Sequence, residues 1–284
     1  MAKVRIITDV TAHLEPDIIE QHKITVLPVE IRFGDVVHVV GPGEQAEDLF
    51  AQMAEGPAQS SSVTIPATVF YEAFAELCRQ TEQVLVIVTS SQLSGAYEQA
   101  RLASRGFLGR CRIVVLDSMS ASWGLGLMVS AAARAASRNL PLDDVVRMVR
   151  GILPHIYLVF LVERLDYLER GGRLGAAQAL LGTMLRIKPL LLMEDGEIVS
   201  LEKVRTRAAA IEKLVDFVTE FASIEEVMIL KSPLDNELNT LIPELKGQLT
   251  QALPRQRFDT MDYDPILATH LGPEALGIIV YEGM

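Results

Sequence analysis

Apolar runs in the first half of the chain each end in a stretch of hydroxyl and carboxyl side chains. The runs and the polar stretches behind them are residues 4–7 with 8–11, 84–88 with 89–94, and 112–116 with 117–122. Continuous apolar runs that pass through such loops into helical periodicity are typical of buried parallel strands. We therefore predict an N-terminal Rossmann-like α/β domain whose polar loops gather at one edge of a parallel sheet.

The second half has a different pattern. Strands are expected at residues 156–162, 187–193, 198–204, 227–231 and 276–281, and helices at 205–221 and 236–253. Asp195-Gly196 between two of the strands predicts a hairpin, so this sheet should be mixed. We predict a two-lobed α/β protein with an N-terminal domain at residues 1–152 and a C-terminal α/β domain at residues 153–284.

Two further segments of the first half have weaker patterns. Residues 24–31 are apolar and predict a single strand that leads to a turn at Gly34-Asp35. Residues 60–66 are rich in hydroxyl groups and end in Pro66, which predicts a loop. A hydroxyl of this loop could cap the following helix or contact a ligand, and the two roles are compatible.

The stretch from Thr89 to Tyr97 combines a strand end, a small polar loop and a helix start. This arrangement places an anion against free backbone N–H groups at a helix N-terminus, where Ser94 and Gly95 would lie. Polar residues at the ends of the other strands, Asp9, Thr11 and Ser118, could join such a site. The alternative for Asp9 or Thr11 is that it caps the next helix.

Charge and composition limit the classes of function. Apolar residues make up 49%, and 26 basic against 37 acidic residues give a net charge of −11, which argues against nucleic-acid binding but allows an anionic small ligand. Cys78 and Cys111 have no metal-ligand spacing, so we expect neither a disulfide framework nor a zinc site. The N-terminus lacks a signal-peptide pattern, and residues 121–136 are too interrupted to span a membrane. A cytoplasmic protein without stable membrane insertion is expected.

A serine hydrolase is one alternative, with Ser94 as nucleophile, His270 as base and Asp9 or Asp117 as the orienting acid. The residue two before Ser94 is Gln92, however, where a nucleophile elbow has glycine. No phosphate-loop motif occurs, and the histidines are isolated from one another and from acidic pairs. We therefore expect no metal and no cofactor.

Several motifs taken together resemble the DegV family. They are Thr8-Asp9-Val10-Thr11-Ala12, residues 90–97, Asp117-Ser118, residues 168–173, Lys188-Pro189 with Asp195-Gly196, residues 203–206, and Thr269-His270-Leu271-Gly272-Pro273. They follow the family order over essentially the whole chain. The resemblance implies a non-catalytic protein that buries a long-chain fatty acid, of the palmitate, stearate or oleate class, between its two lobes. It also implies a carrier that presents the acyl carboxylate to a separate fatty acid kinase.

The resemblance also implies residue roles. The carboxylate contacts fall on Ser94, beside Gly95, and on His270. A hydroxyl of the loop at residues 62–66 should join them. Alignment of the family pattern on Phe70 makes Ser62 the contact, whereas alignment on Pro66 places Val63 there with Thr64 beside it, and we favour Ser62. The sequence departs from the family where Val10 replaces a serine and Ala96 replaces a threonine. These replacements leave fewer hydroxyl groups at the mouth of the expected site.

Arg173 and Arg205 have a predicted role different from carboxylate binding. On the resemblance, these arginines face the kinase partner or the transferred phosphate, for which a guanidinium is well suited. The alternative is that Arg173 is a solvated loop charge and that Arg205 pairs with an acid such as Glu202. The fatty-acid carrier is thus the main hypothesis. An acyl-ester hydrolase acting through Ser94 and His270, or a domain that senses another anionic metabolite, is the alternative.

Overall fold

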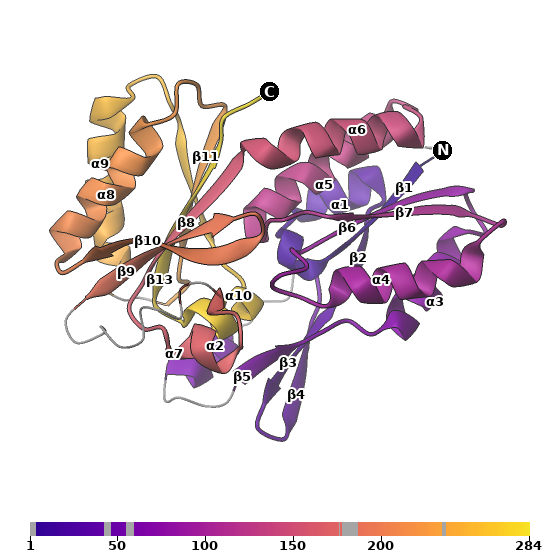
Figure 1. The fold of residues 1–284 in the computed structure, drawn as a ribbon, viewed down its shortest axis with the longest axis horizontal. Helices are drawn as coiled ribbons and strands as arrows, with labels where there is room; N and C mark the ends of the chain where they lie inside the picture. Colours follow the sequence, from indigo (N-terminus) through magenta and orange to yellow (C-terminus); the bar gives the residue numbers. More distant parts are fainter. Residues whose placement is uncertain (1–3, 43–46, 55–59, 176, 178–186, 235–236) are drawn as a thin grey trace. The chain divides into compact units, whose positions relative to one another are not determined.

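The protein is described by a computed structural model at residues 4–42, 47–54, 60–175, 177, 187–234 and 237–284. It divides into two compact units (Figure 1). The first comprises Met1–Gln45 and Ser62–Pro154, and the second Ala46–Ser61 and His155–Met284. The domain boundary between residues 152 and 153 stays a prediction. The two units differ from the predicted domains by the segment 46–61 and by residues 153–154. Within the described ranges, no helix has both the length and the apolarity to cross a membrane.

The first unit is built on a parallel sheet with strand order β2-β1-β6-β7. Its strands are β1 (Val4–Asp9), β2 (Thr25–Leu27), β6 (Gln83–Val88) and β7 (Arg112–Asp117). Val84 to Val88 are completely buried, as expected for a strand covered on both faces. The carboxyl ends of β1, β6 and β7 lie at the same edge, so the predicted gathering of their polar loops is confirmed.

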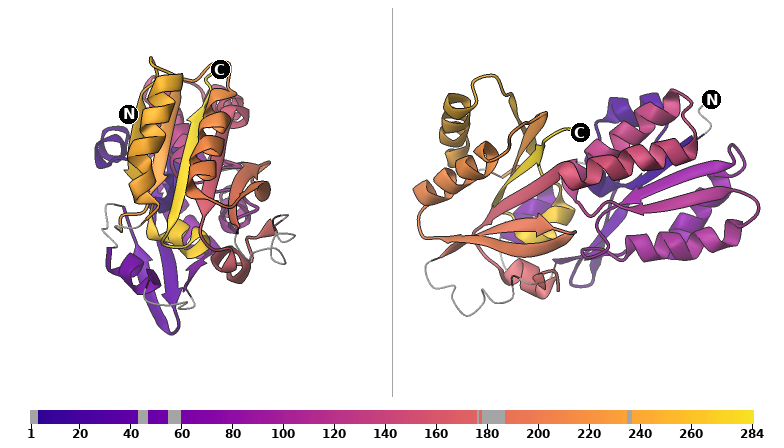
Figure 2. Two further views of the ribbon diagram at one scale, coloured as in Figure 1. Left: turned by 90° about the vertical axis from the view of Figure 1, so that its left-hand side faces the viewer. Right: turned by 45° about the horizontal axis from the view of Figure 1, so that its top comes forward.

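Helices cover both faces of this sheet, with α3 and α4 on one face and α1, α5 and α6 on the other (Figures 1 and 2). The α-helices are α1 (Pro16–His22), α3 (Ala67–Leu77), α4 (Ala96–Ser104), α5 (Ser122–Ser137) and α6 (Leu142–Ile152). Short 3-10 helices are η1 (Val10–Ala12), η2 (Arg105–Phe107) and η3 (Leu153–His155). A Cβ atom at Gly126 would lie 2.1 Å from the carbonyl oxygen of Ala12. Glycine at this position therefore allows α5 to pack directly on η1.

The single strand expected at residues 24–31 is wrong, because Pro28 divides it. Proline lacks the N–H that a continuing ladder would need, and the chain leaves the parallel sheet after β2. It continues as β3 (Val29–Phe33) and β4 (Val36–Val40), which form a second sheet in the order β4-β3-β5. Strand β5 (Ser60–Val63) occupies part of the expected loop at residues 60–66. The N-cap residue of α3 is Pro66, and no side chain caps this helix. The possible helix-capping role of a hydroxyl from residues 60–66 is therefore wrong.

Cys78 and Cys111 form a disulfide, which corrects the expectation that they do not pair. Cys78 follows the last residue of α3 and Cys111 immediately precedes β7, and their Cα atoms are 5.8 Å apart. The pairing could not be inferred from spacing because it depends on how α3 packs beside the sheet. The bridge links the end of a covering helix to the start of a core strand.

The second unit contains a mixed sheet in the order β10-β9-β8-β13-β11-β12. Its strands are β8 (Ile156–Val162), β9 (Lys188–Glu194), β10 (Glu197–Val204), β11 (Glu226–Lys231), β12 (Phe258–Asp262) and β13 (Ala275–Tyr281). Only β11 and β12 pair in parallel among these neighbours. Asp195 and Gly196 both have positive φ and make the predicted hairpin turn. The predicted fold class is confirmed.

Helices α8 (Arg207–Thr219) and α9 (Ile242–Ala252) pack on this sheet through a common apolar core. The predicted helix start at residue 236 lies outside the described residues, and η5 (Asn239–Leu241) leads into α9. At one end of the sheet, α10 (Pro265–Leu271) contacts both α7 (Asp166–Arg170) and α2 (Glu47–Ala54). The last turn of α10 carries His270, which was expected in a loop.

Candidate functional site

Asp9 organises the polar edge of the first unit. Its carboxylate caps η1 by accepting the Thr11 N–H at 3.0 Å, and it also accepts the Thr11 hydroxyl and, at 3.4 Å, the Thr89 N–H. The hydroxyls of Thr11 and Thr89 are 2.6 Å apart. Asp9 is buried, so its negative charge depends on these donors. The capping alternative is confirmed for Asp9, although the capped helix is η1 and not α1.

The loop after β7 is held by similar local bonds. Asp117 accepts the N–H groups of Ser91 and Met119 at 3.1 and 2.9 Å. The buried Ser118 hydroxyl donates to the carbonyl of Ser120 at 3.0 Å and accepts that residue's N–H at 3.2 Å. Asp117 thus joins the loops that follow β6 and β7, and Ser118 shapes its own loop.

Ser94 and Gly95 lie at the start of α4, as predicted. Gly95 is the N-cap residue, and the Ser94 hydroxyl accepts the Ala96 N–H at 3.3 Å. A Cβ atom at Gly95 would lie 2.9 Å from Cγ2 and 3.3 Å from Oγ1 of Thr64. The absence of a side chain therefore lets Thr64 approach the helix start. Backbone N–H groups and two hydroxyls gather here, which is suitable for a carboxylate head group.

The two candidates from the 62–66 segment have different positions. Ser62 is part of β5, whereas Thr64 follows that strand and contacts Gly95. Both side chains are partly buried. The structure therefore brings Thr64 together with Gly95 and Ser94, and the role of Ser62 stays a prediction.

His270 is the central polar side chain at its end of the second unit. Burial of its ring, with the Arg173 guanidinium nearby, lowers the pKa of His270 to about 3. The imidazole is therefore neutral at physiological pH, with one N–H donor and one acceptor nitrogen. A Cβ atom at Gly171 would lie 3.1 Å from its Nδ1 atom, so the Gly171-Gly172 turn lies directly against the ring.

Arg173 follows this turn and is not a solvated loop charge. Its side chain is partly buried and donates to the carbonyl of Gly171, and its backbone N–H donates to Leu168 at 2.9 Å. Burial lowers the pKa of Arg173. A positive charge is thus held close to the neutral His270 ring, where it favours an anion over a cation.

Tyr263 fixes the turn that follows His270, a role that the sequence did not suggest. Its hydroxyl donates to the carbonyl of Gly272 at 3.1 Å and accepts the N–H of Ala275 at 3.0 Å. Burial raises the pKa of Tyr263, so the phenol stays protonated. The helix itself had a recognisable signal, because Asp264 caps α10 and Pro265 occupies its first turn.

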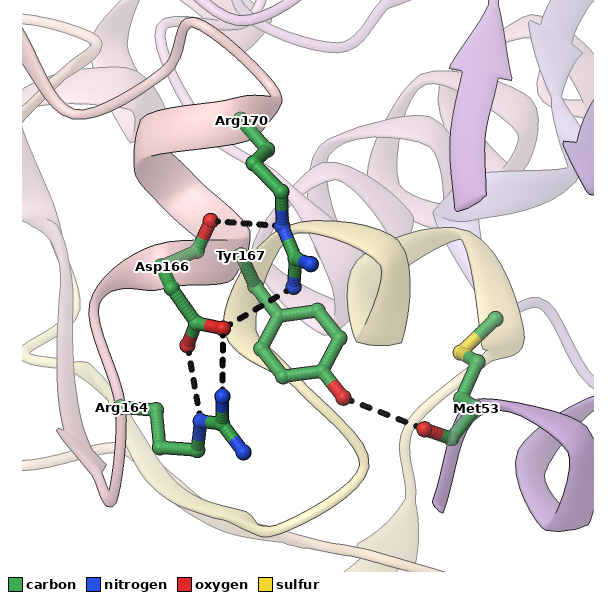
Figure 3. Close-up of polar contacts among 5 residues, drawn as sticks. All are labelled: Met53, Arg164, Asp166, Tyr167 and Arg170. Atoms are coloured by element: carbon green, nitrogen blue, oxygen red, sulfur yellow. Dashed lines mark hydrogen bonds and ion pairs between the residues drawn. The ribbon is translucent and has the colours of Figure 1, made fainter. Parts of the chain in front are cut away.

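Tyr167 makes a second link to the same region (Figure 3). Its hydroxyl donates to the carbonyl of Met53 in α2 at 3.1 Å, and its ring lies 3.0 Å from where a Cβ atom of Gly272 would be. Asp166 binds both Arg164 and Arg170, and the Arg170 guanidinium lies 5.0 Å from the centre of the Tyr167 ring. The Tyr167 hydrogen bond therefore joins α7 to α2, and the Asp166 ion pairs hold α7 itself.

Arg205 lies exposed before α8, whose cap is the Thr206 side chain. The suggested partner Glu202 forms an ion pair with Lys213 at 3.3 Å. The structure therefore pairs Glu202 with Lys213 and not with Arg205. The predicted docking of a kinase or phosphate at Arg205 stays a prediction.

The fold defines an α/β protein of two compact units, one with a parallel sheet and one with a mixed sheet. A family model described as "Uncharacterised protein, DegV family" matches residues 3–283. The chain belongs to the DegV family, as its motifs suggested. A DegV domain-containing protein of Caldanaerobacter subterraneus is 31% identical over 99% of this chain and 100% of that protein. One from Listeria monocytogenes is 30% identical over 97% of each.

Solved structures agree with the fold. A structure described as "Fatty Acid Binding of a DegV family Protein from Thermus thermophilus" has a TM-score of 0.87 and 26% identity, over 99% of this chain and 100% of that one. A fatty acid binding DegV family protein from Streptococcus agalactiae has a TM-score of 0.90 and 23% identity, with full coverage of both chains. The second likeness concerns the fold alone.

Proposed function

We propose that this protein binds a long-chain fatty acid and holds its carboxylate with hydroxyl groups and a neutral histidine. The observation that carries the proposal is the whole-chain likeness to the fatty-acid-binding protein of Thermus thermophilus. The proposed carboxylate contacts are Ser94, Gly95 and His270, together with Ser62 or Thr64. The acyl chain occupies an apolar tunnel, and each buried methylene contributes about 0.8 kcal/mol to binding.

The electrostatics of His270 support this assignment. A carboxylate buried without donors would cost several kcal/mol, and a neutral imidazole can supply an N–H donor without being charged. The Arg173 guanidinium, which lowers the pKa of His270, attracts an anion at the same place. The hydroxyls of Ser94 and Thr64 add two further donors.

The second part of the proposal concerns transfer. The carrier presents the fatty acid carboxylate to a separate kinase, and Arg173 and Arg205 contact that kinase or the transferred phosphate. Arg205 is exposed, and a guanidinium forms paired hydrogen bonds with phosphate oxygens. The chain itself then needs no catalytic base or nucleophile.

The contacts of the acids disfavour the hydrolase alternative. Asp9 and Asp117, the acids that could orient a catalytic histidine, instead accept backbone N–H groups of their own and neighbouring loops. A histidine whose pKa is about 3 is also a weak general base at neutral pH. Neither observation favours nucleophilic chemistry at Ser94.

Native mass spectrometry of delipidated protein mixed with palmitate, stearate or oleate tests the binding proposal. We expect one acyl chain per protein, with affinity about tenfold lower in Ser94→Ala and in His270→Gln, the equivalent of a lost charged hydrogen bond. Ser104→Ala, at the exposed end of the same helix α4, is the matched control and should bind normally. Absence of any bound lipid would sink the proposal, and fluorophosphonate labelling that Ser94→Ala abolishes would establish the hydrolase instead.

The transfer step has a separate test. Arg205→Ala should reduce phosphorylation of the bound fatty acid by a fatty acid kinase, while fatty acid affinity stays within about twofold. Arg173→Ala should reduce phosphorylation too, and it should also lower fatty acid affinity because the guanidinium lies near His270. Normal phosphorylation by both variants would contradict the docking role without affecting the binding proposal.

A further inference from the structure

Strand β4 forms an open edge of its sheet. It pairs with β3 on one side only, and within the described chain no strand pairs with its other side (Figure 1). Val36, Val37 and Val39 are 56%, 45% and 52% exposed. Edge strands are normally protected by lysine, proline or a bulge, and β4 contains none of these. An apolar, β-branched edge of this kind is suited to pairing with another strand.

The backbone of β4 is oriented for such pairing. Phe33 and Val36 flank the two-residue turn Gly34-Asp35 and face one another in the hairpin. Residues that flank a two-residue turn exchange backbone hydrogen bonds, and this exchange recurs at every second residue. The N–H and C=O groups of Val37 and Val39 therefore point to the open edge.

The residues from Val36 to Val40 read Val-Val-His-Val-Val, which is the same in both directions. A second copy of this strand, antiparallel and centred on His38, places Val37 opposite the partner's Val39 and Val39 opposite the partner's Val37, so valine faces valine at these positions, a favourable cross-strand pair. These are the residues whose backbone groups point outward, so four hydrogen bonds can form. We propose that β4 is a homodimer interface, occupied by β4 of a second copy of this chain.

Charges on the neighbouring strand do not oppose this arrangement. Glu30 lies beside Val39 and Arg32 beside Val37. Each row across the four strands then runs Glu30, Val39, the partner's Val37 and the partner's Arg32. The charges that end these two rows are opposite in sign but about 14 Å apart across three strand spacings, so they do not oppose pairing and add little to it.

The proposed interface is small. Strand β4 has five residues, so pairing buries less than about 1,200 Å², the range of weak and transient complexes. The dimer should therefore form in a concentration-dependent way, with dissociation at roughly micromolar to millimolar concentrations. It does not depend on the fatty-acid-binding proposal.

Sedimentation velocity of the full chain, from about 10 μM to 1 mM, tests the proposal. Val37→Glu and Val39→Lys should each weaken dimerisation at least tenfold, because each places a charge against a valine. Within its own hairpin, the new glutamate at position 37 faces Arg32 and the new lysine at position 39 faces Glu30. The variants should therefore keep the wild-type thermal stability. Leu108→Lys, at an 80% exposed position outside the hairpin, is the control and should dimerise normally.

The double variant Val37→Glu/Val39→Lys identifies the register. In the arrangement centred on His38, each new glutamate faces a new lysine of the partner, so dimerisation should return to within about threefold of the wild type. Wild-type protein that is monomeric at every concentration would overturn the proposal and leave an extended peptide from another protein as the occupant. A double variant that dimerises no better than the single variants would also overturn it.

Discussion

Gly171 and His270 are in direct contact, since a Cβ atom at Gly171 would lie 3.1 Å from Nδ1 of the histidine. The contact explains why the turn after α7 contains glycine at this position although its φ of −69° suits any residue. The first of the two glycines leaves space for the ring, and the second, Gly172, supplies a positive φ of 67°.

Gly171→Ala should therefore displace the His270 ring by a few tenths of an ångström. We expect fatty acid affinity to fall about fivefold, the equivalent of one weakened hydrogen bond, with little change in melting temperature. Competition with a fluorescent acyl probe measures the affinity. Gly247→Ala, where nothing lies within 4 Å of the new methyl group, is the control, and equal affinities of the two variants would contradict the prediction.

The low pKa of His270 predicts how stability depends on pH. In the unfolded chain its pKa is about 6.5, and in the folded chain about 3, so between these values the unfolded state binds the proton more strongly. The free energy of unfolding should therefore decrease as pH falls from 6.5 towards 3, with a contribution of up to about 1.4 kcal/mol per pH unit. Urea unfolding of delipidated wild type and His270→Gln measures this, and equal slopes would refute it.

Tyr263→Phe should destabilise the second unit. The change leaves the buried Ala275 N–H and Gly272 carbonyl without the phenol that bonds both. We expect a loss of about 2 to 4 kcal/mol in the free energy of unfolding, since each unsatisfied group costs about 1 to 3 kcal/mol. Tyr71→Phe, at a 47% exposed ring, should change stability by less than about 0.5 kcal/mol. Equal urea midpoints for the two variants would be inconsistent with this role.

The Cys78–Cys111 disulfide should stabilise the first unit. The bridge spans 33 residues, for which the loss of chain entropy in the unfolded state predicts about 3 to 4 kcal/mol. Dithiothreitol should therefore lower the melting temperature of the wild type but not that of Cys78→Ala/Cys111→Ala. A reductant effect of the same size in both proteins would show that the bridge does not contribute.

The sequence predicted those parts of the fold that depend on short segments. The apolar strands ending in polar loops, and the Asp195-Gly196 hairpin, follow from local periodicity and turn chemistry. The position of Ser94 and Gly95 at a helix start was predictable for the same reason. Pro28, which follows the last residue of β2, and Asp264-Pro265, at the start of α10, are local signals of the same kind.

Other features depend on packing between distant segments. Thr64 could be related to Gly95 only after β5 and α4 were placed, and the contact of Gly171 with His270 requires α7 to lie beside α10. The roles of Tyr167 and Tyr263 depend on carbonyl groups of Met53 and Gly272. Because every residue has a backbone carbonyl, the sequence does not indicate which carbonyl a tyrosine hydroxyl will bind.

The α2 segment has a consequence for how the protein can be divided. Because Ala46–Ser61 belongs to the second unit, the polypeptide passes from one unit to the other three times, and a single cut after Pro154 does not separate them. A fragment ending there would keep α2 without the partners of Leu49, Phe50 and Met53, which are buried in the intact chain. The complementary fragment would lack the carbonyl that Tyr167 binds. Neither fragment should therefore fold as the independent product of a split gene unless the segment Ala46–Ser61 is moved to the C-terminal fragment.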